Sequence, residues 1–534
     1  MPSYTTPGVY IEEVASSSRT LTSGDTAVAA FVGFTQKAPK DDLKNDPHGI
    51  QPRQVTNWSQ FEELYGGLTD PKEAILPHSV FGFFNNGGRR AYIVRIPHTE
   101  LSDKSGTLAL KSPDLALGKE AVEFATKEPN ADITVTIERE PDKDSEPAAD
   151  ASAKPKKVSP EPPTFTISVS DAGDGSTEKY EGVTLADIES DLKKSTKVSV
   201  ATKIDLKDLD PSLQLLEVGR FAIEPAKGEL LKEVPSSDFG GKEAARTGIS
   251  GLAIHEDVTM VMVPDLYTAC MKSPTFDWNL WKSVQLSLIT HCELQKNRMA
   301  ILDTPPNMTP QKVKAWRADS AYDSPFAALY YPWIEIDNPA AKNGNKTFMA
   351  PPCGHVAGIW SRTDDTRGVW KAPANETLRG VLGVDRAMTK EEQGTLNPDG
   401  INCIRKFGTY GIRVWGARTL STNTDWTYIN VRRLFNMIET AIVDGTQYAV
   451  FEPNDQKLWE GLKRTMSAYL RGLWRDGALF GATAEQAFFV KCDEETNPPD
   501  ARDRGEVVVE VGIAPVKPAE FVIFRISQKK DEAA

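Results

Sequence analysis

Short apolar runs near the start of the chain predict two buried strands. The run TAVAAFVGFT at 26–35 is rich in residues that favour strands, and AYIVRI at 91–96 follows the turn signal NNGGRR. Neither run alternates cleanly with polar residues, which is typical of strands covered on both faces. We expect residues 26–97 to form the first part of an α/β core.

A strand–helix–strand pattern begins after residue 250. VTMVMVPD at 258–265 and RMAILDTPP at 298–306 are strand-like, and the segment between them has helical periodicity. The apolar residues that recur there at three- and four-residue spacing are Trp281, Val284, Leu288 and Cys292. Such a βαβ unit implies parallel pairing with a right-handed crossover. Further strand-like runs lie at 326–334 and 411–419. We therefore expect the main α/β core to span 251–420.

The pattern changes between the two core segments. Residues 98–250 contain short strand-like runs around a segment rich in Pro, Ala and charge at 139–163. That segment has too little apolar surface to offset the entropy lost on ordering. We expect 98–250 to be an inserted, mostly β surface domain with a flexible loop near 139–163.

Helical patterns return in 421–504, which we expect to be a C-terminal helical part of the core. Its longest helix is expected to start after an N-cap at Asn454. The predicted buried stripe of this helix is Leu458, Leu462, Met466, Tyr469 and Leu473. The basic residues off that stripe are Lys457, Arg464, Arg471 and Arg475.

Both ends of the chain carry strand-like segments outside the core. GVYIEEV at 8–14 belongs to a predicted N-terminal arm, residues 1–25. VVVEV at 507–511 and FVIFRI at 521–526 belong to a predicted C-terminal arm and tail, 505–534, and are able to pair as a hairpin. A hairpin alone is marginal in water, and a lone strand leaves its main-chain polar groups unpaired.

The N-terminal strand is apolar on both faces, since Val9 and Ile11 point one way and Tyr10 and Val14 the other. It can pair within its own chain, with the core sheet or the C-terminal arm. Alternatively it completes a sheet in a neighbouring copy through main-chain hydrogen bonds. A head-to-tail contact of this kind need not close, and it predicts a helical or stacked-ring assembly.

Composition and charge argue against some classes of function. The 534 residues carry a formal charge of −13, which argues against nucleic acid as a partner because phosphate binding needs clustered Lys and Arg. The five cysteines are far apart and form no CxxC pair, which fits synthesis in a reducing cytoplasm. No signal-peptide pattern is present and no apolar run approaches the roughly 20 residues that span a bilayer, so we expect no direct membrane insertion.

The sequence gives only weak indications of a catalytic or metal-binding site. Asp265 and Asp303 each follow a predicted parallel strand, where doubly wound enzymes place ligands, but carboxylates there also hold turns and helix ends. His291 and Glu293 point apart on a helix and do not form a metal pair.

Cys353 beside His355 lacks a third orienting group and an oxyanion hole. No phosphate-binding glycine motif appears. We expect no catalytic residue, no metal and no cofactor.

Several long motifs, in order, resemble those of the tail sheath proteins of contractile phages and of phage-tail-like injection particles. They are PSYTTPGVYIEEV at the start, HCELQKNRMAILDTPP, PPCGHVAGIWSRTDDTRGVWKAPAN at 351–375, and GIRVWGARTLSTNTDWTYINVRRLFNMIE. The resemblance covers both ends and nearly everything after about residue 250. It fails over 98–250.

The resemblance implies a structural subunit that assembles with sixfold helical symmetry around an inner tube, between baseplate and terminal cap proteins, in a metastable extended state. It implies that arms of adjacent subunits share a sheet. The residues it assigns to the arms are Val9, Tyr10, Ile11, Val14, Val507, Val508, Val509, Val511, Phe521, Val522, Ile523 and Phe524. It would turn the basic residues of the long C-terminal helix toward the tube, although a merely solvated basic face explains them equally well.

The family also implies assembly in a bacterial cytoplasm, as part of a phage tail or of an injection particle that is released from the cell. The long insertion slightly favours the injection particle. Two rival interpretations stay open: a non-contractile capsid or tail protein, and a doubly wound enzyme that uses Asp265 and Asp303.

Overall fold

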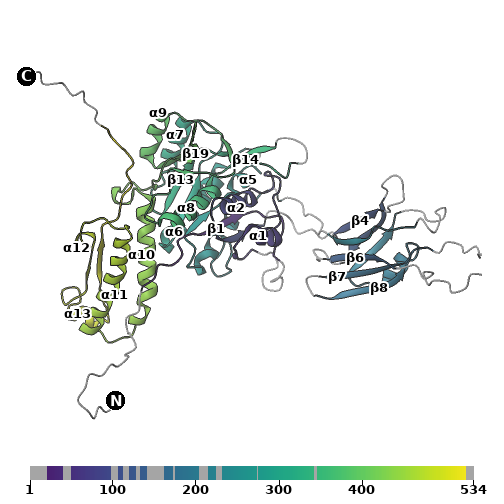
Figure 1. Ribbon diagram of the computed structural model, residues 1–534, viewed down its shortest axis with the longest axis horizontal. Coiled ribbons are helices and arrows are strands. Elements are labelled where there is room, and N and C mark those ends of the chain that lie inside the picture. Colours follow the sequence, from purple (N-terminus) through teal and green to yellow (C-terminus); the bar gives the residue numbers. More distant parts are fainter. Residues whose placement is uncertain are drawn as a thin grey trace, which may run out of the picture. The chain divides into compact units, whose positions relative to one another are not determined.

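The computed structural model describes residues 21–39, 50–97, 106–111, 120–127, 133–140, 162–171, 175–203, 214–223, 231, 233–272, 275–341 and 346–524. These residues fall into two compact units (Figure 1), one made of 21–97 with 233–524 and the other of 106–231. The predicted strand at 8–14, with Val9, Tyr10, Ile11 and Val14, lies outside the described residues.

A nine-stranded sheet forms the centre of the first unit, in the order β16-β19-β18-β13-β12-β11-β1-β3-β2. The six inner strands are parallel: β1 (Val28–Gly33), β3 (Arg90–Arg95), β11 (Met260–Met262), β12 (Met299–Asp303), β13 (Ala327–Tyr331) and β18 (Ile401–Phe407). The outer strands pair antiparallel: β2 (Arg53–Val55), β16 (Glu376–Thr377) and β19 (Gly411–Val414). The α/β class and the parallel βαβ unit are confirmed.

Alternate residues of β1 enter two different cores, as the period of a strand requires. Val28, Ala30 and Val32 pack with the helices on one face, whereas Ala29 and Phe31 pack with those on the other. The first face is covered by α5 (Leu266–Cys270), α6 (Trp278–Gln295), α7 (Pro310–Ser320) and α9 (Lys390–Leu396). The second is covered by α1 (Trp58–Tyr65), α2 (Leu76–Asn85) and α8 (Cys353–Arg367).

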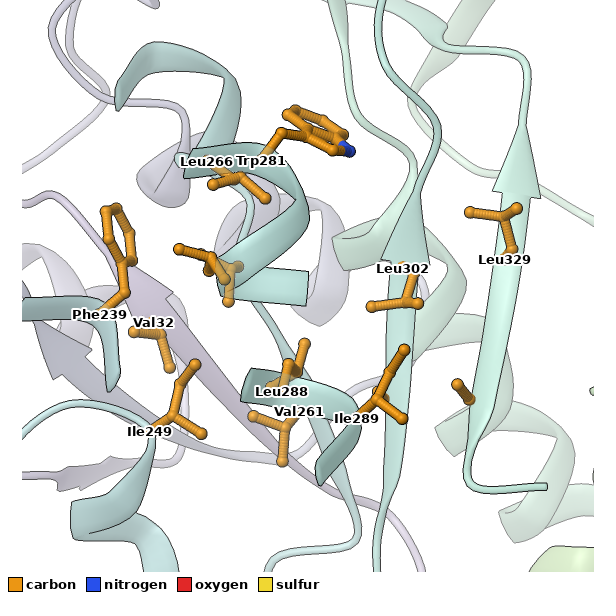
Figure 2. Packing of buried hydrophobic residues seen from close by; sticks show 14 of the residues in the cluster. Val32, Phe239, Ile249, Val261, Leu266, Trp281, Leu288, Ile289, Leu302 and Leu329 are labelled. Atoms are coloured by element: carbon orange, nitrogen blue, oxygen red, sulfur yellow. The ribbon is translucent and has the colours of Figure 1, made fainter. Parts of the chain in front are cut away.

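Helix α6 lies on the sheet through the apolar stripe read from the sequence. Its Trp281, Val284, Leu288 and Cys292 are all buried. Figure 2 shows Leu288 near Val261 and Ile289 near Leu302, whereas Trp281 lies near Leu266 of α5. The helix starts where Asp277 accepts hydrogen bonds from two backbone N–H groups of the first turn.

Helices α2 and α8 approach closely because glycines face the contact. A Cβ on Gly354 would lie 2.4 Å from the carbonyl oxygen of Ser79, and a Cβ on Gly358 would lie 2.5 Å from that of Phe83. Real Cβ atoms do not tolerate such distances, so only glycine lets the two backbones pack at this spacing.

A small sheet and three short 3₁₀ helices complete this part of the chain. They are β14 (Ile334–Asp337), β15 (Thr347–Ala350), β17 (Val381–Val384), η3 (Ser250–Ile254), η4 (Asn397–Asp399) and η5 (Thr424–Trp426).

The C-terminal part of the first unit has its own apolar cluster. Its elements are α10 (Ile429–Thr446), η6 (Gln447–Ala449), α11 (Gln456–Arg475), α12 (Ala484–Ala487), β20 (Phe488–Lys491), α13 (Pro499–Asp503) and β21 (Glu510–Ile513). The cluster joins Leu434 and Ile438 of α10 to Leu462, Met466 and Leu470 of α11. The predicted stripe of α11 is shifted slightly, since Trp459 and Leu470 are buried while Leu458 and Tyr469 are only partly covered.

Two local expectations in this region are wrong. The N-cap of α11 is Asp455, whose side chain accepts from the Leu458 N–H, because Asn454 bonds instead to the Glu506 carbonyl and the Trp459 indole. The predicted hairpin between 507–511 and 521–526 is absent among the described residues, because β21 pairs antiparallel with β20.

The second unit packs two antiparallel sheets around one core. The four-stranded sheet is β10-β6-β7-β8 and the three-stranded one is β4-β5-β9. Their bounds are β4 (Thr107–Lys111), β5 (Glu120–Thr126), β6 (Ile133–Arg139), β7 (Phe165–Asp171), β8 (Thr177–Val183), β9 (Val198–Thr202) and β10 (Gly219–Ile223), with α3 (Ile188–Asp191) and η1 (Leu192–Lys194).

The inserted segment ends earlier than residue 250. Residues 233–250, which include α4 (Ser236–Gly240), belong to the first unit. The reason is burial, because Val234, Phe239 and Ile249 enter the core under α6. Most of the predicted flexible loop, residues 141–161, lies outside the described residues.

We predict that Gly354→Ala destabilises the first unit by about 1–3 kcal/mol, because the added methyl group overpacks the contact between α2 and α8. The matched control is Gly394→Ala in α9, where a Cβ meets nothing within 4 Å. There alanine is expected to stabilise by about 0.5–1 kcal/mol. Urea denaturation followed by tryptophan fluorescence measures both, and equal midpoints for the two variants would contradict the packing explanation.

Candidate functional site

The carboxylate of Asp265, one of the two possible catalytic groups, holds the backbone together. It is fully buried and accepts hydrogen bonds from the N–H groups of Phe34 at 2.6 Å, Ile75 at 2.5 Å and Leu76 at 3.1 Å. These donors lie after β1 and at the start of α2, so Asp265 joins both to the end of β11. Burial raises the pKa of this carboxyl to about 7, against the effect of the three N–H donors.

Asp303 plays a similar part at the end of β12. Its Oδ1 atom accepts from the Cys353 N–H at 3.0 Å, which ties the strand to the start of α8, and burial raises its pKa to about 7. The cavity beside it, bounded by Val263 and Trp333, has a volume of about 10 Å³. That is room for one water molecule and none for a substrate, so nothing here supports the enzyme alternative.

The other titratable candidates are also buried in the packing. Burial lowers the pKa of His291 to about 4, with a contribution from Arg298 close by, and lowers the pKa of His355 to about 4. Burial raises the pKa of the Cys353 thiol, which therefore stays protonated. Within the described ranges, no group of three or more His, Cys, Asp and Glu side chains is arranged to hold a metal ion.

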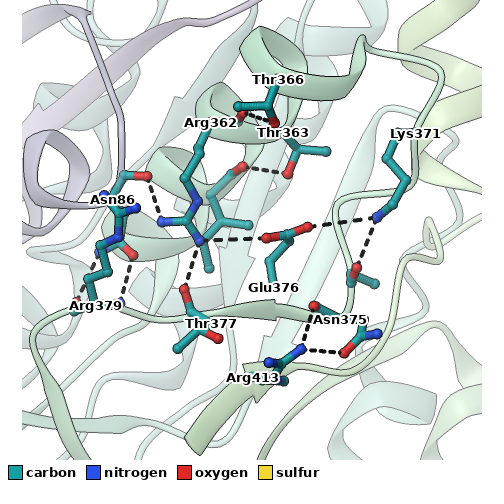
Figure 3. A network of polar contacts seen from close by, with 12 residues as sticks. Asn86, Arg362, Thr363, Thr366, Lys371, Asn375, Glu376, Thr377, Arg379 and Arg413 are labelled. Carbon is teal, nitrogen blue, oxygen red and sulfur yellow. Dashed lines mark hydrogen bonds and ion pairs between the residues drawn. The ribbon is translucent and has the colours of Figure 1, made fainter. Parts of the chain in front are cut away.

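The motif at 366–375 links the core to the C-terminal helices. Val369 and Trp370 pack against the apolar cluster of α10 and α11, and the Trp370 carbonyl accepts from the Asn430 side chain. Asn375 has φ +61° and its Oδ1 accepts from Arg413 at 2.8 Å (Figure 3). The motif thus has a structural role, since its side chains and backbone join the core to the C-terminal helices.

Arg362 extends this network across the end of α8. Its guanidinium donates to the Asn86 carbonyl at 3.0 Å and to the Thr377 carbonyl at 2.8 Å, and lies 3.8 Å from Glu376 (Figure 3). The turn at Asn86, far away in sequence, is joined in this way to α8 and to the β16 edge of the sheet.

A buried ion pair fixes α10 to the core and was not foreseen. Arg433 of α10 binds both oxygens of Asp364 in α8, at 2.8 and 2.6 Å, and also donates to the Thr26 carbonyl. The pair borders a cleft of about 260 Å³ whose lining includes Asp25, Asp257 and Asp444. No spacing in the sequence links positions 364 and 433, so pattern analysis had no signal for the pair.

The sheet of β20 and β21 is the main candidate for an interaction surface. Val490 lies opposite Val511, one of the predicted arm residues. One side of β21 and the segment before it packs on α10 and α11 through Val507, Val509 and Val511. Among the described residues these two strands pair only with each other, so each keeps an outer edge of main-chain N–H and C=O groups without a strand partner.

Side-chain amides hold the approach to β21. Asn497 binds both main-chain groups of Val508, accepting from its N–H at 2.7 Å and donating to its carbonyl at 3.0 Å. Asn454 donates to the Glu506 carbonyl at 2.9 Å. The predicted arm residues 507–511 therefore rest on their own chain.

The predicted arm residues 521–524 are placed differently. Phe521, Val522, Ile523 and Phe524 are 69–81% exposed, and no backbone hydrogen bond joins them to the rest of the described chain. Four consecutive large apolar residues in solvent are unusual on a subunit surface.

The predicted basic face of α11 is on the surface. Lys457, Arg464, Arg471 and Arg475 are all exposed, on the side away from the buried Leu462 and Met466. No helix in the described part of the chain has both the length and the apolar character needed to cross a bilayer.

Two family profiles match consecutive parts of the chain. The phage tail sheath protein central domain matches residues 249–420 and the phage tail sheath C-terminal domain matches 421–529. These matches, of 172 and 109 residues, cover just over half of the 534 residues. The chain belongs to the phage tail sheath family, a family of structural proteins and not of enzymes.

Curated relatives agree over part of their length. The tail sheath protein of Vibrio phage KVP40 is 30% identical over 196 residues, which is 36% of this chain and 28% of that protein. That of Enterobacteria phage T4 is 28% identical over 176 residues, 32% of this chain and 26% of the relative. The chain spans less than a third of the first two curated relatives it matches.

Solved structures share the fold over nearly the whole chain. The contracted helical sheath of the anti-feeding prophage covers 98% of this chain and is itself covered completely, with a TM-score of 0.56 and 23% identity. The match to the contracted sheath complex of an extracellular contractile injection system, PVC, covers 99% of this chain and 99% of the PVC chain. Its TM-score is 0.54 and the sequence identity is 23%.

We predict that the two buried carboxyls make the free subunit less stable as pH rises from about 4 to 7. Each pKa is raised from 3.8 to about 7 in the folded state, so the folded state holds more protons than the unfolded state in this window, and stability falls with rising pH. Asp303→Asn keeps the acceptor for the Cys353 N–H without ionising.

The free energy of unfolding, measured by urea denaturation at several pH values, should therefore depend less on pH in Asp303→Asn than in the wild type. Asp319→Asn, on the exposed surface of α7, is the control and should keep the wild-type dependence. Identical dependence in all three proteins would show that the ionisation of Asp303 is not coupled to folding.

Proposed function

We propose that this chain is the subunit of a contractile sheath, held to its neighbours by strands exchanged between copies. One observation carries the proposal: the C-terminal part presents a supported two-stranded sheet with open edges and, a few residues later, an exposed apolar segment of strand-like sequence. One copy has both an acceptor and a donor for β-augmentation.

Main-chain pairing suits a contact that must last while subunits move. The hydrogen bonds depend little on side-chain identity, so a strand stays paired while the globular faces exchange contacts. In the proposed assembly, Val9, Tyr10, Ile11 and Val14 of one copy and Phe521, Val522, Ile523 and Phe524 of another add to β20 and β21 of a third. Val507, Val508, Val509 and Val511 lie in and before the receiving strand.

The assembly we propose winds with sixfold helical symmetry around an inner tube, between a baseplate and terminal caps. The structural neighbours support it, because they include a helical sheath and a baseplate of the anti-feeding prophage. Contraction then draws on a metastable lattice and needs no nucleotide. It drives the tube through a target envelope.

The particle that this sheath belongs to is proposed to be assembled in a bacterial cytoplasm. Similarity in fold to the sheath of an extracellular contractile injection system over 99% of the chain supports a tail-like particle that is released from the cell. The tail sheath proteins of the phages KVP40 and T4 match shorter segments, 36% and 32% of this chain.

The basic face of α11 is proposed to touch the inner tube. Lys457, Arg464, Arg471 and Arg475 are exposed on a helix whose opposite side is anchored in the apolar cluster. A contact made of exposed charges is easily screened and releases readily, as a sheath that slides over its tube requires.

We predict that the purified chain, or the chain expressed with its tube protein, forms striated hollow cylinders in negative-stain electron microscopy. Deleting residues 1–15 should leave a soluble, folded monomer that no longer polymerises. Val9→Pro with Ile11→Pro should have the same effect, because proline cannot donate a main-chain hydrogen bond.

The control for the proline variant is Val9→Thr with Ile11→Thr, which keeps every main-chain donor and should still assemble. Long cylinders from the deletion variant would exclude an inter-chain role for the N-terminal strand. Rigid tubes of one fixed length state would point to a non-contractile structural protein.

We predict that Arg464→Glu with Arg471→Glu weakens association with the tube protein at least tenfold while cylinders still form. Cosedimentation of tube and sheath at low and moderate salt measures it, and wild-type binding should itself fall with salt. The same change of charge at Lys312 and Lys390, on α7 and α9, is the control and should leave binding as it is. A solvated basic face without a partner would give equal binding for all three proteins.

A further inference from the structure

The C-terminal segment is held on its own subunit up to one residue, Glu520. Its Oε1 atom accepts from Arg418 Nε at 2.9 Å and from Asn397 Nδ2 at 3.1 Å, and its Oε2 atom accepts from Arg418 Nη2 at 2.5 Å. The Tyr428 hydroxyl lies 3.4 Å from Oε2. We call these four side chains the Glu520 anchor. Bidentate pairing with arginine is the strongest of the common charge-assisted arrangements.

The receiving side of the anchor is rigid. Asn402 in β18 binds both main-chain groups of Arg418, accepting from its N–H and donating to its carbonyl, each at 2.7 Å. Arg418 also forms a β-bridge with Tyr428 just before α10. The guanidinium is therefore presented from backbone that is tied into the central sheet.

The side chains of Arg418 and Glu520 are both largely buried, with exposed fractions of 19% and 20%. Burial alone would raise the pKa of Glu520, but the hydrogen bonds from Arg418 and Asn397 keep it below its ordinary value. The ionised, paired form is the one that the fold favours, and in this partly covered position it is screened less than a surface ion pair.

Contacts change abruptly on either side of this residue. Before it, Ala514 donates to the Ala487 carbonyl, and the Val516 carbonyl accepts from Asn430 at 3.0 Å. After it, residues 521–524 are exposed and have no backbone hydrogen bond to any described residue. Between Val516 and Glu520, Lys517 and Ala519 are exposed and no backbone hydrogen bond joins 517–519 to other described residues, so the Glu520 side chain is the last contact that holds the described segment.

We propose that the Glu520 anchor sets the point at which the C-terminal arm leaves its own subunit, so that only residues after 520 are given to a second copy of this chain. The segment 507–520, expected from sequence to be part of the arm, stays with its own core. This inference rests on the proposed function. It adds the residue at which the exchanged strand begins and the side chains that carry tension from a neighbouring subunit.

The anchor also explains how a neighbour can pull on the arm without unzipping β21. A two-stranded sheet alone resists peeling poorly, because its hydrogen bonds break one pair at a time. Tension that enters at Phe521 reaches the Glu520 anchor first, and the anchor passes it to β18 and α10. Strand β21 is then spared, and the acceptor sheet for other copies persists.

Spin labels on the unassembled full-length chain test the anchor directly. All five natural cysteines are buried, so an introduced surface cysteine is labelled selectively. Ala519→Cys reports on the anchored segment, and Val508→Cys reports on the approach to β21; both positions are exposed. Electron paramagnetic resonance measures the mobility of each label.

We expect the label at 519 to be slow in the wild type and at least threefold faster in Glu520→Gln, with the label at 508 slow in both. Glu506→Gln, which removes an exposed ion pair with Arg504 in the same segment, is the matched control and should change neither label. Equal mobility at 519 with and without the carboxylate would overturn the proposal, and so would release of the label at 508 together with that at 519.

Assembly provides the second readout. If cylinders form, those of Glu520→Gln should come apart at a lower urea concentration than those of the wild type and of Glu506→Gln. Equal resistance of the three kinds of cylinder to urea would show that the Glu520 anchor does not carry tension between subunits. Because the spin-label result is obtained on free subunits, a failure of the wild type to polymerise counts against the proposed function and leaves the test of the anchor intact.

Discussion

Each main-chain N–H and C=O that leaves water needs a partner, and this requirement organises the whole first unit. The six inner strands satisfy it by parallel pairing, with helices covering both faces of the sheet. Where the chain turns away from the sheet, Asp265 and Asp303 supply the missing acceptors. These two carboxylates lie where an enzyme would have its active site, but they serve to hold the backbone. The edge strands β2 and β16 are short, which disfavours pairing of the sheet with another strand.

The C-terminal part meets the same requirement only in part. Strands β20 and β21 are supported from one side by α10 and α11, and they have two open edges among the described residues. A rigid support with unsatisfied edges is well suited to bind extended segments from other copies. The exposed apolar residues after Glu520 have the opposite property, since they are strand-like and form no backbone hydrogen bond with any described residue. Incomplete pairing within one copy is what would make a polymer of copies stable.

Local patterns predicted the buried core well because they report burial. The runs at 26–35 and 91–96, and the stripe of α6, are apolar for the reason that they lie between layers, and each was found there. Sequence patterns did not predict the structure where two residues or segments were equally suited to the same role. Asn454 and Asp455 are both good N-caps, and Asp455 caps α11 because the Asn454 amide is engaged by Glu506 and Trp459. Likewise the strand character of 521–526 carried no information on its partner, and the possible hairpin with 507–511 is absent among the described residues, where β21 pairs with β20.

The sequence by itself determined the α/β class, the parallel βαβ unit, the family and the basic face of α11, because all of these depend on residue types and their spacing along the chain. Only the tertiary structure decided which groups meet across long separations. Arg433 finds Asp364, and Glu520 finds Arg418, over 69 and 102 residues. It also assigned residues 233–250 to the core and 507–513 to their own subunit. The physical reason is that an ion pair or a strand pairing is satisfied by proximity in space, which residue spacing along the chain does not encode.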